Sequence, residues 1–184
     1  MIDKDLIWHE QCRRTVFETR IFSVGEAESV GPGGQKGTFS LVSSRPWALV
    51  MPVLITERGR EFVMVRQWRH GAREISVEFP GGVIESGEAV DAGIRRELRE
   101  ETGYTAKKWT LLGTMNPNPA FMENMMSFYL AEDLEYAGTQ ELDSDEFVSV
   151  ETHPVETVIS AMGTAPYIHA LMAAGLSFFL KHPC

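Results

Sequence analysis

Cysteine is almost absent from this chain of 184 residues, which contains only Cys12 and Cys184. Two thiols so far apart form no disulfide framework and no zinc or redox pattern, so the sequence predicts a reduced, cytoplasmic protein. Long apolar runs are also missing. The longest, residues 47–55, contains Pro52, whereas a membrane-spanning helix needs about 20 apolar residues. The N-terminus has no apolar segment of signal-peptide type, and no membrane partner is expected.

Basic residues are few as well. Lys and Arg number 17 against 26 Asp and Glu, which gives a net charge of −9. A nucleic-acid surface needs a basic patch, so no nucleic-acid partner is expected, whereas a site that gathers carboxylates around cations fits this balance. The contents of 43% hydrophobic and 23% charged residues are ordinary for a globular protein. The length suits one compact domain with a small appended element.

The hydrophobic pattern predicts strands on both sides of one central helix. Strands at 15–24 and 38–42, around a glycine-rich loop, form an expected N-terminal β-hairpin region over residues 1–45, and a second domain spans 46–184. Further strands are expected at 48–55, 62–68, 75–79, 109–115, 126–131 and 147–151. Helices are expected at 89–102, with Gly103 as C-cap, and within 155–162 and 167–182. These elements predict an α/β or α+β sandwich.

The last expected helix has an apolar face, and a core position is its simplest interpretation. The face is formed by Ile168, Leu171, Met172, Leu176, Phe179 and Leu180.

The central helix carries an unusual group of carboxylates. Glu97, Glu100 and Glu101 follow the spacing i, i+3 and i+4, so their side chains share one face of the helix. Three carboxylates this close repel one another unless water or a cation separates them, and oxygen ligands alone favour Mg2+ or Mn2+ over zinc. A solvated acidic face is the plain alternative. Gly81 and Gly82 precede the helix and allow the backbone to approach a metal or a phosphate.

This segment resembles the Nudix box at every defined position of that motif. The matching residues are Gly82, Glu88, Arg96, Glu97, Leu98, Glu100, Glu101, Gly103 and Tyr104. Nine matches within one short window are far more specific than a lone glycine motif. The resemblance implies a Nudix α/β/α sandwich with a mixed β-sheet. It also implies attack of water on phosphorus in a substrate that links a nucleoside diphosphate to another group.

The resemblance assigns roles within the box. It implies that Glu97 and Glu101 are the leading ligands of Mg2+ (or Mn2+), that Glu100 is a third ligand or a catalytic group, and that Gly81 offers its carbonyl oxygen to the metal. Arg96, a candidate catalytic residue, and Glu88 resemble residues that organise the loop and the ligands. The metals neutralise the diphosphate, activate the water and stabilise the leaving phosphate.

Two elements outside the box resemble the ADP-ribose pyrophosphatase branch of the family. They are Gln67-Trp68-Arg69 and Glu78-Phe79-Pro80-Gly81-Gly82, and Pro119 also stands at the branch's distance from the box. The sequence around Pro119 departs from the branch's usual Ser-Pro-Gly. Arg69 and Glu78 become candidate substrate-binding residues, because a guanidinium grips phosphate oxygens. An ion pair at strand ends remains the alternative for both, and Trp68 is expected in the core.

The same branch has a catalytic glutamate on a mobile loop after the helix, and Glu146 in the acidic run with Asp143 and Asp145 occupies that place. An acidic solvated loop is the alternative. Members of the branch exchange N-terminal strands in a homodimer and stack aromatic side chains on the base. Phe39, and more weakly Phe22, match those aromatics, although both also suit a strand core. A homodimer is therefore expected.

The predicted activity is cleavage of the pyrophosphate bond of a nucleotide sugar such as ADP-ribose into a nucleoside monophosphate and a sugar phosphate. Two alternatives remain open. One is a Nudix hydrolase of dinucleoside polyphosphates or nucleoside triphosphates. The N-terminal hairpin disfavours this alternative. The other is a non-catalytic module that senses a nucleotide, which loss of box carboxylates would support; none is lost.

Overall fold

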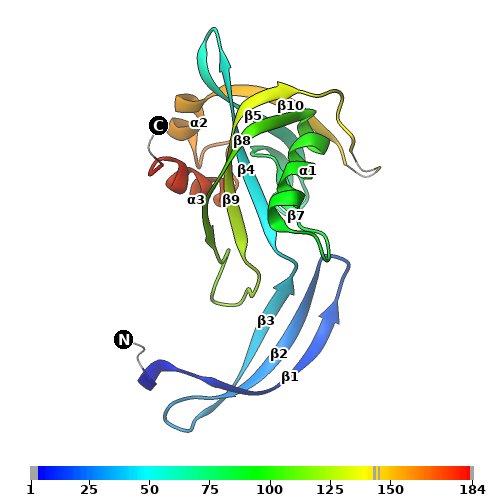
Figure 1. The fold of residues 1–184 in the computed structure, drawn as a ribbon. Coiled ribbons are helices and arrows are strands. Elements are labelled where there is room, and N and C mark those ends of the chain that lie inside the picture. Colours follow the sequence, from blue (N-terminus) through cyan, green and yellow to red (C-terminus); the bar gives the residue numbers. More distant parts are fainter. Residues whose placement is uncertain (1–3, 143, 145, 183–184) are drawn as a thin grey trace. The chain divides into compact units, whose positions relative to one another are not determined.

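The structure is a computed structural model that describes residues 4–142, 144 and 146–182. Asp143, Asp145 and Cys184 of the sequence analysis lie outside the described residues. The chain divides into two compact units (Figure 1). One unit contains Met1–Arg45 and Asn116–Met125, and the other contains Pro46–Met115 and Met126–Cys184. None of the helices in the described part of the chain is long and apolar enough to cross a bilayer.

The segment 116–125 was placed with the catalytic domain by sequence, but it belongs to the first unit. Backbone hydrogen bonds explain this difference. The Val42 N–H donates to the Phe121 carbonyl at 2.7 Å, and the Glu123 N–H donates to the Val42 carbonyl at 3.0 Å. The Glu123 carboxylate also accepts from Arg13 at 2.6 Å. The segment is therefore attached along the last strand of the first unit.

The first unit is an antiparallel meander of three strands after the short 3-10 helix η1 (Lys4–Leu6). Its strands are β1 (His9–Glu18), β2 (Phe22–Val30) and β3 (Lys36–Ser44). The strand expected at 15–24 is wrong, because residues 19–21 form a turn between β1 and β2. The Thr19 hydroxyl accepts hydrogen bonds from the backbone N–H groups of Ile21 and Phe22 there, a local interaction that favours turns. The predicted hairpin is thus two successive hairpins.

The second unit contains a mixed sheet with the strand order β10-β5-β4-β9-β8, while β6 pairs with β5 and β7 with β4. Strands β4 and β9 run parallel, and the other pairs are antiparallel. The strands are β4 (Trp47–Thr56), β5 (Gly59–Arg69), β6 (Glu74–Glu78), β7 (Gly81–Val83), β8 (Tyr104–Met115), β9 (Met126–Tyr136) and β10 (Val148–Pro154).

Helices cover both faces of this sheet. Helix α1 (Val90–Thr102) lies on one face, and α2 (Val155–Ala161) and α3 (Ala170–Phe179) lie on the other (Figure 1). The alternation of β4 explains the two layers: Ala48 and Val50 join the core under α1, whereas Leu49, Met51 and Val53 join the core under α2 and α3. The predicted α/β/α sandwich with a mixed sheet is confirmed.

Candidate active site

The box loop is built around Gly81, at the start of β7. Its φ of +150° is a conformation that residues with side chains rarely adopt, and a Cβ there would lie 2.3 Å from the Ala48 carbonyl oxygen. Only glycine fits this close approach to β4. The Gly81 N–H donates a hydrogen bond of 2.9 Å to the carboxylate of Glu101. The loop therefore reaches the carboxylate face of α1, and the role of the Gly81 carbonyl as a metal ligand stays a prediction.

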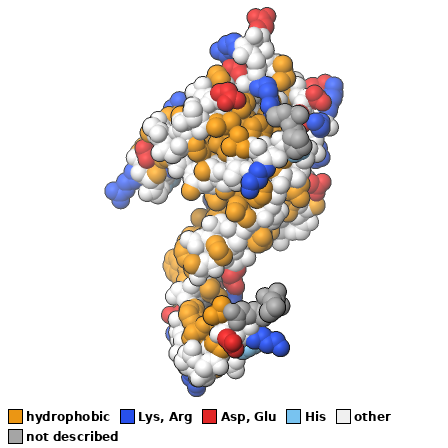
Figure 2. Space-filling model, turned by 90° about the vertical axis from the view of Figure 1, so that its left-hand side faces the viewer, with side chains coloured by type: hydrophobic (Ala, Val, Ile, Leu, Met, Phe, Trp, Pro, Cys, Tyr) orange, Lys and Arg blue, Asp and Glu red, His pale blue; other side chains and the backbone are white. Residues whose placement is uncertain are grey.

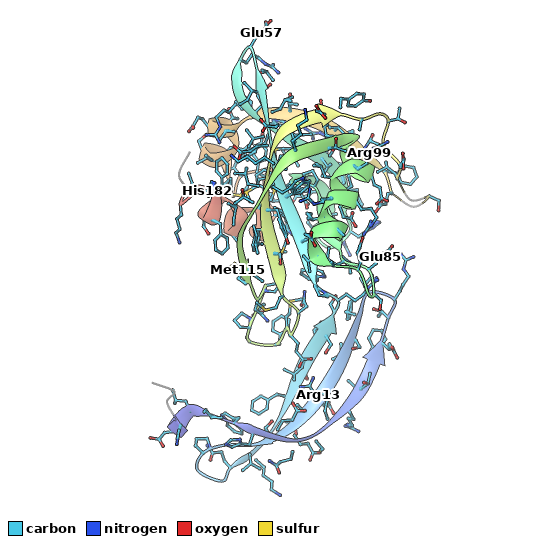
Figure 3. All side chains as sticks on the ribbon, in the orientation of Figure 1. Arg13, Glu57, Glu85, Arg99, Met115 and His182 are labelled. Atoms are coloured by element: carbon cyan, nitrogen blue, oxygen red, sulfur yellow. The ribbon has the colours of Figure 1, made fainter. Side chains whose placement is uncertain are left out.

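Arg96 holds three of the box carboxylates together. Its guanidinium contacts Glu88 at 3.1 Å, Glu97 at 3.0 Å and Glu100 at 2.8 Å. Hydrogen bonds from Arg96 also hold the pKa of Glu88 below its usual value. Figure 3 labels Glu85, in the loop before α1, and Arg99, in the last turn of this acidic helix. Arg96 thus fixes the loop and two candidate metal ligands in one place.

Of the carboxylates on this face, Glu101 is buried and Glu97 is partly buried. Glu101 is 6% exposed, and burial raises its pKa to about 8, with further raising by the negative charges of Glu97 and Glu146 and opposition from the Gly81 N–H. Burial also raises the pKa of Glu97, while Arg96 opposes the shift. Buried carboxylates held this close are costly when ionised unless positive charge compensates them.

The chemistry of these donors fits a hard divalent cation, because all are oxygen ligands, one of them a buried carboxylate and another a partly buried one. Within the described residues, no three acidic, histidine or cysteine side chains are gathered tightly enough to enclose a cation. The positive charge of Arg96 contacts Glu97 and Glu100 at 3.0 Å and 2.8 Å, while Glu101 accepts from the Gly81 N–H. The candidate ligands are Gly81, Glu97, Glu100 and Glu101.

The loop that contains Glu146 is anchored to the C-terminal end of α1. The Gln140 side chain donates to the backbone carbonyls of Glu101 at 2.6 Å and Val148 at 3.2 Å, and the Glu141 N–H donates to the Glu100 carbonyl at 2.9 Å. Glu146 is exposed, yet its charge raises the pKa of Glu97 and Glu101. Its negative charge therefore acts on both carboxylates. Gln140 matches no motif, so the sequence alone does not indicate it as an anchor.

Arg69 and Glu78 form an ion pair next to the box loop. The guanidinium donates from Nε at 2.8 Å and from Nη2 at 2.6 Å to the two carboxylate oxygens, and Glu78 is 1% exposed. Burial disfavours its charged form, but Arg69 and His169 outweigh this and hold the pKa of Glu78 well below its usual range. His169 was missed by sequence reasoning, because it only precedes an apolar helix and matches no motif.

A cavity of about 430 Å³ opens beside this pair. Its lining includes Trp47, Arg69, Glu78, Gly81, Gly82 and His169. Gly82 connects the cavity with the carboxylate face, because a Cβ at this position would lie 3.1 Å from the Glu97 carboxylate. A diphosphate at Gly81 and Gly82 would thus have the acidic helix on one side and a ligand-sized cavity on the other.

The two candidate stacking residues belong to the first unit. Phe39 lies on β3, is 42% exposed and packs edge-to-face against Trp8 with ring centroids 5.0 Å apart. Phe22 begins β2 opposite Ser44 and is half-buried. Phe39 therefore presents an aromatic surface, whereas Phe22 is more enclosed within its sheet. Their role in base stacking stays a prediction.

An α/β/α sandwich with a glycine loop and an acidic helix beside a cavity is an arrangement typical of hydrolases that act with divalent cations. Residues 46–173 match the NUDIX domain, and the chain belongs to the Nudix family. It is 29% identical over 167 residues to the ADP-ribose pyrophosphatase of Bacillus subtilis, covering 90% of this chain and 89% of that one. It is 30% identical over 136 residues to the methanol dehydrogenase activator of Bacillus methanolicus, covering 73% and 72%.

A solved structure described as an ADP compounds hydrolase has the same fold. Its TM-score is 0.79 at 22% identity, and the alignment covers 95% of this chain and 92% of that one. Together with the domain match, these likenesses confirm the prediction of a Nudix hydrolase that resembles the ADP-ribose pyrophosphatase branch.

Proposed function

We propose that this protein is a metal-dependent hydrolase that cleaves the pyrophosphate bond of nucleoside diphosphate sugars such as ADP-ribose. The observation that supports it most is the carboxylate pair of the buried Glu101 and the partly buried Glu97, joined through Gly81 to a cavity that is also lined by Arg69. The name of the Bacillus subtilis relative points to the same substrate class. Water adds its oxygen to one phosphorus and the bridging oxygen leaves with the other, which gives a nucleoside monophosphate and a sugar phosphate.

Each group of residues has its own part in this reaction. Glu97, Glu100, Glu101 and the Gly81 carbonyl would hold Mg2+ or Mn2+, which supplies positive charge to the diphosphate and lowers the pKa of bound water. Arg69 uses Nε and Nη2 for Glu78, which leaves N–H groups of Nη1 to donate to phosphate oxygens. Glu146 would accept the proton of the attacking water.

A substrate panel tests this proposal. With Mg2+ present, we expect turnover of ADP-ribose, with AMP and ribose phosphate as products on chromatography. GDP-mannose, UDP-glucose, dinucleoside polyphosphates and deoxynucleoside triphosphates complete the panel. Preference for either of the last two groups would favour the alternative Nudix hydrolase. Nucleotide binding without turnover of any compound would favour a sensing module and contradict the proposed enzyme.

We further propose a homodimer assembled through the N-terminal strands. Figure 2 shows hydrophobic side chains at the surface of the first unit, and Leu6, Phe17 and Ile21 there are 72%, 58% and 54% exposed. Apolar side chains this exposed on one small unit are typical of an interaction surface. Light scattering should report twice 20.6 kDa.

Two variants make the test of the dimer specific. Phe17→Glu is expected to shift the mass toward that of a monomer, because it buries a charge in the interface. Ile55→Glu is the matched control, since Ile55 is 72% exposed but belongs to the second unit. A fully active wild-type monomer at micromolar concentration would contradict the dimer.

A further inference from the structure

We propose that His169 is a positioning residue for substrate binding, which acts on Arg69 through the carboxylate of Glu78. The inference rests on the proposed function, because it assumes that Arg69 contacts the diphosphate. It adds a residue outside the Nudix box and outside the two elements typical of the ADP-ribose pyrophosphatase branch. His169 immediately precedes α3, so the C-terminal helix contributes to the site.

The geometry of Glu78 carries the inference. Its Oε2 lies 2.6 Å from Nη2 of Arg69 and 2.8 Å from Nδ1 of His169, so one oxygen is shared by two partners. The angle at His169 does not meet good hydrogen-bond geometry, so the contact is a close polar one. Because Glu78 is 1% exposed, water cannot readily replace a lost partner.

The orientation of Arg69 depends on this carboxylate. Two of its nitrogens are bound side-on by Glu78, which fixes the plane of the guanidinium and the direction of its remaining N–H groups. The Arg69 side chain is 43% exposed and lines the cavity, so its guanidinium is accessible to a ligand there. If His169 is removed, the Glu78 carboxylate can rotate, and the guanidinium is then no longer held in one orientation.

Contacts of the surrounding loop, which do not involve the His169 side chain, hold this residue next to Glu78. The loop before α3 is joined to β6 by a hydrogen bond of 3.0 Å from the Val77 N–H to the Pro166 carbonyl. Tyr167, in the same loop, is buried in the core under α2 and α3. Substitution of His169 should therefore leave the loop in place and remove only the contact with Glu78.

The chain offers a matched control with the same three residue types. Arg66 on β5 pairs with Glu151 on β10, and Nε2 of His153 lies 2.8 Å from Oε2 of that glutamate. The side chain of His153 is 21% exposed and that of His169 is 33% exposed. The residues described as lining the cavity include His169 but not His153. A merely structural Arg–Glu–His contact should behave alike at both places.

The experiment measures the affinity for inorganic pyrophosphate by calorimetry in the presence of Mg2+, together with KM and kcat for ADP-ribose. His169→Ala should weaken pyrophosphate binding roughly fivefold, a typical coupling within one ion-pair network. It should raise KM more than it lowers kcat. In an Arg69→Ala background the same substitution should have no further effect, because its target is gone. His153→Ala also removes a contact of 2.9 Å with the Tyr167 hydroxyl, but the backbone bond from Val77 to Pro166 still holds the loop, so affinity and KM should stay near their wild-type values.

Additive effects of Arg69→Ala and His169→Ala would overturn the proposal, and so would equal effects of His169→Ala and His153→Ala. Unchanged pyrophosphate affinity in Arg69→Ala would also overturn it. If His169→Ala does not fold, His169→Phe provides the same cycle, because its ring fills the space of the imidazole but has no nitrogen to contact Glu78. Failure of the wild type to hydrolyse ADP-ribose would refute the proposed function alone, since the pyrophosphate cycle can still be measured.

Discussion

Glu101→Gln is expected to lower kcat by about three orders of magnitude or more, and Glu97→Gln by a similar factor. Each substitution removes one negative oxygen ligand from a site whose cation supplies several kcal/mol of charge stabilisation, and each 1.36 kcal/mol lost from it costs about tenfold in rate. Steady-state kinetics with ADP-ribose and Mg2+ measure the loss. EDTA should abolish turnover of the wild type, and full activity in EDTA would refute the proposed metal dependence.

The fold of Glu101→Gln should survive. Because burial raises the pKa of Glu101 to about 8 from the ordinary value of 4.5, the folded metal-free protein favours the neutral acid. Its contribution to stability is complete below about pH 4.5 and is lost as the pH rises through about 8. Glutamine stays neutral, and its oxygen can still accept from the Gly81 N–H. Without metal, the Tm of the variant should therefore equal or exceed that of the wild type above pH 8.

A nearby glutamate provides the control for this loss of activity. Glu85 precedes α1, is exposed (Figure 3) and is not part of the box motif. Glu85→Gln should keep kcat near the wild-type value. Equal losses in Glu85→Gln and Glu101→Gln would indicate a general effect of negative charge and would contradict ligation by Glu101.

Local patterns predicted the central part of the fold well. The helix expected at 89–102 is α1, which begins at Val90, and Gly103 is its C-cap with φ of +75°. Periodicity and a C-terminal glycine are properties of a short stretch, so the sequence contains them directly. The strands at 48–55, 62–68 and 75–79 are also confirmed as β4, β5 and β6, with small shifts at their ends.

Elements that depend on partners distant in the chain were predicted less well. Strand β8 begins at Tyr104, five residues before the expected start, because its polar first residues pair with the end of β9. Trp68, expected in the core, is 49% exposed near the end of β5, where it pairs with Ile75 of β6. Leu180, expected on the buried face of the last helix, is 62% exposed at the C-cap of α3. Burial of each depends on neighbours that periodicity does not reveal.

In the candidate site, too, the residues of a local motif were predicted, and a residue that depends on distant contacts was not. The box motif identified Gly81, Glu97 and Glu101 as candidates, because they lie on one loop and one helix within a short stretch of sequence. His169 joins them only through the cavity and Glu78, which lies 91 positions earlier in the chain. The helix after His169 is apolar, and its pattern was read as core. Ile168 and Leu171 of that pattern in fact line the cavity.

Glu146→Gln is expected to lower kcat at least about a hundredfold, because a general base contributes roughly 10²- to 10⁴-fold. The structure supports this position for the base. The charge of Glu146 raises the pKa of both Glu97 and Glu101, so it acts on the two leading candidate metal ligands. Removal of the proton acceptor leaves the cation ligands and Arg69 intact, so KM should change much less than kcat.

The anchors of the loop define the control for this experiment. Glu141 lies in the same loop, is paired with Arg99 at 2.9 Å, and its side chain is 65% exposed. Glu141→Gln removes an equal charge from the loop, yet it should retain most of kcat. Asp143 and Asp145 are near enough in sequence to accept the proton in part, so each is tested as a single Asn variant.

The ratio of the kcat values of Glu141→Gln and Glu146→Gln distinguishes two roles for this loop: a general base at Glu146, or a general effect of its negative charge. If the charge of the loop alone matters, Glu141→Gln and Glu146→Gln should lower kcat by similar factors, and high salt should reduce the effect of each because exposed charges are screened. Proton transfer predicts instead a loss specific to Glu146. If Glu146→Gln keeps more than about a tenth of the wild-type kcat, well short of the loss typical for a base, the proton acceptor is elsewhere. Glu100 is then the next candidate, because it lies in the box and is 34% exposed.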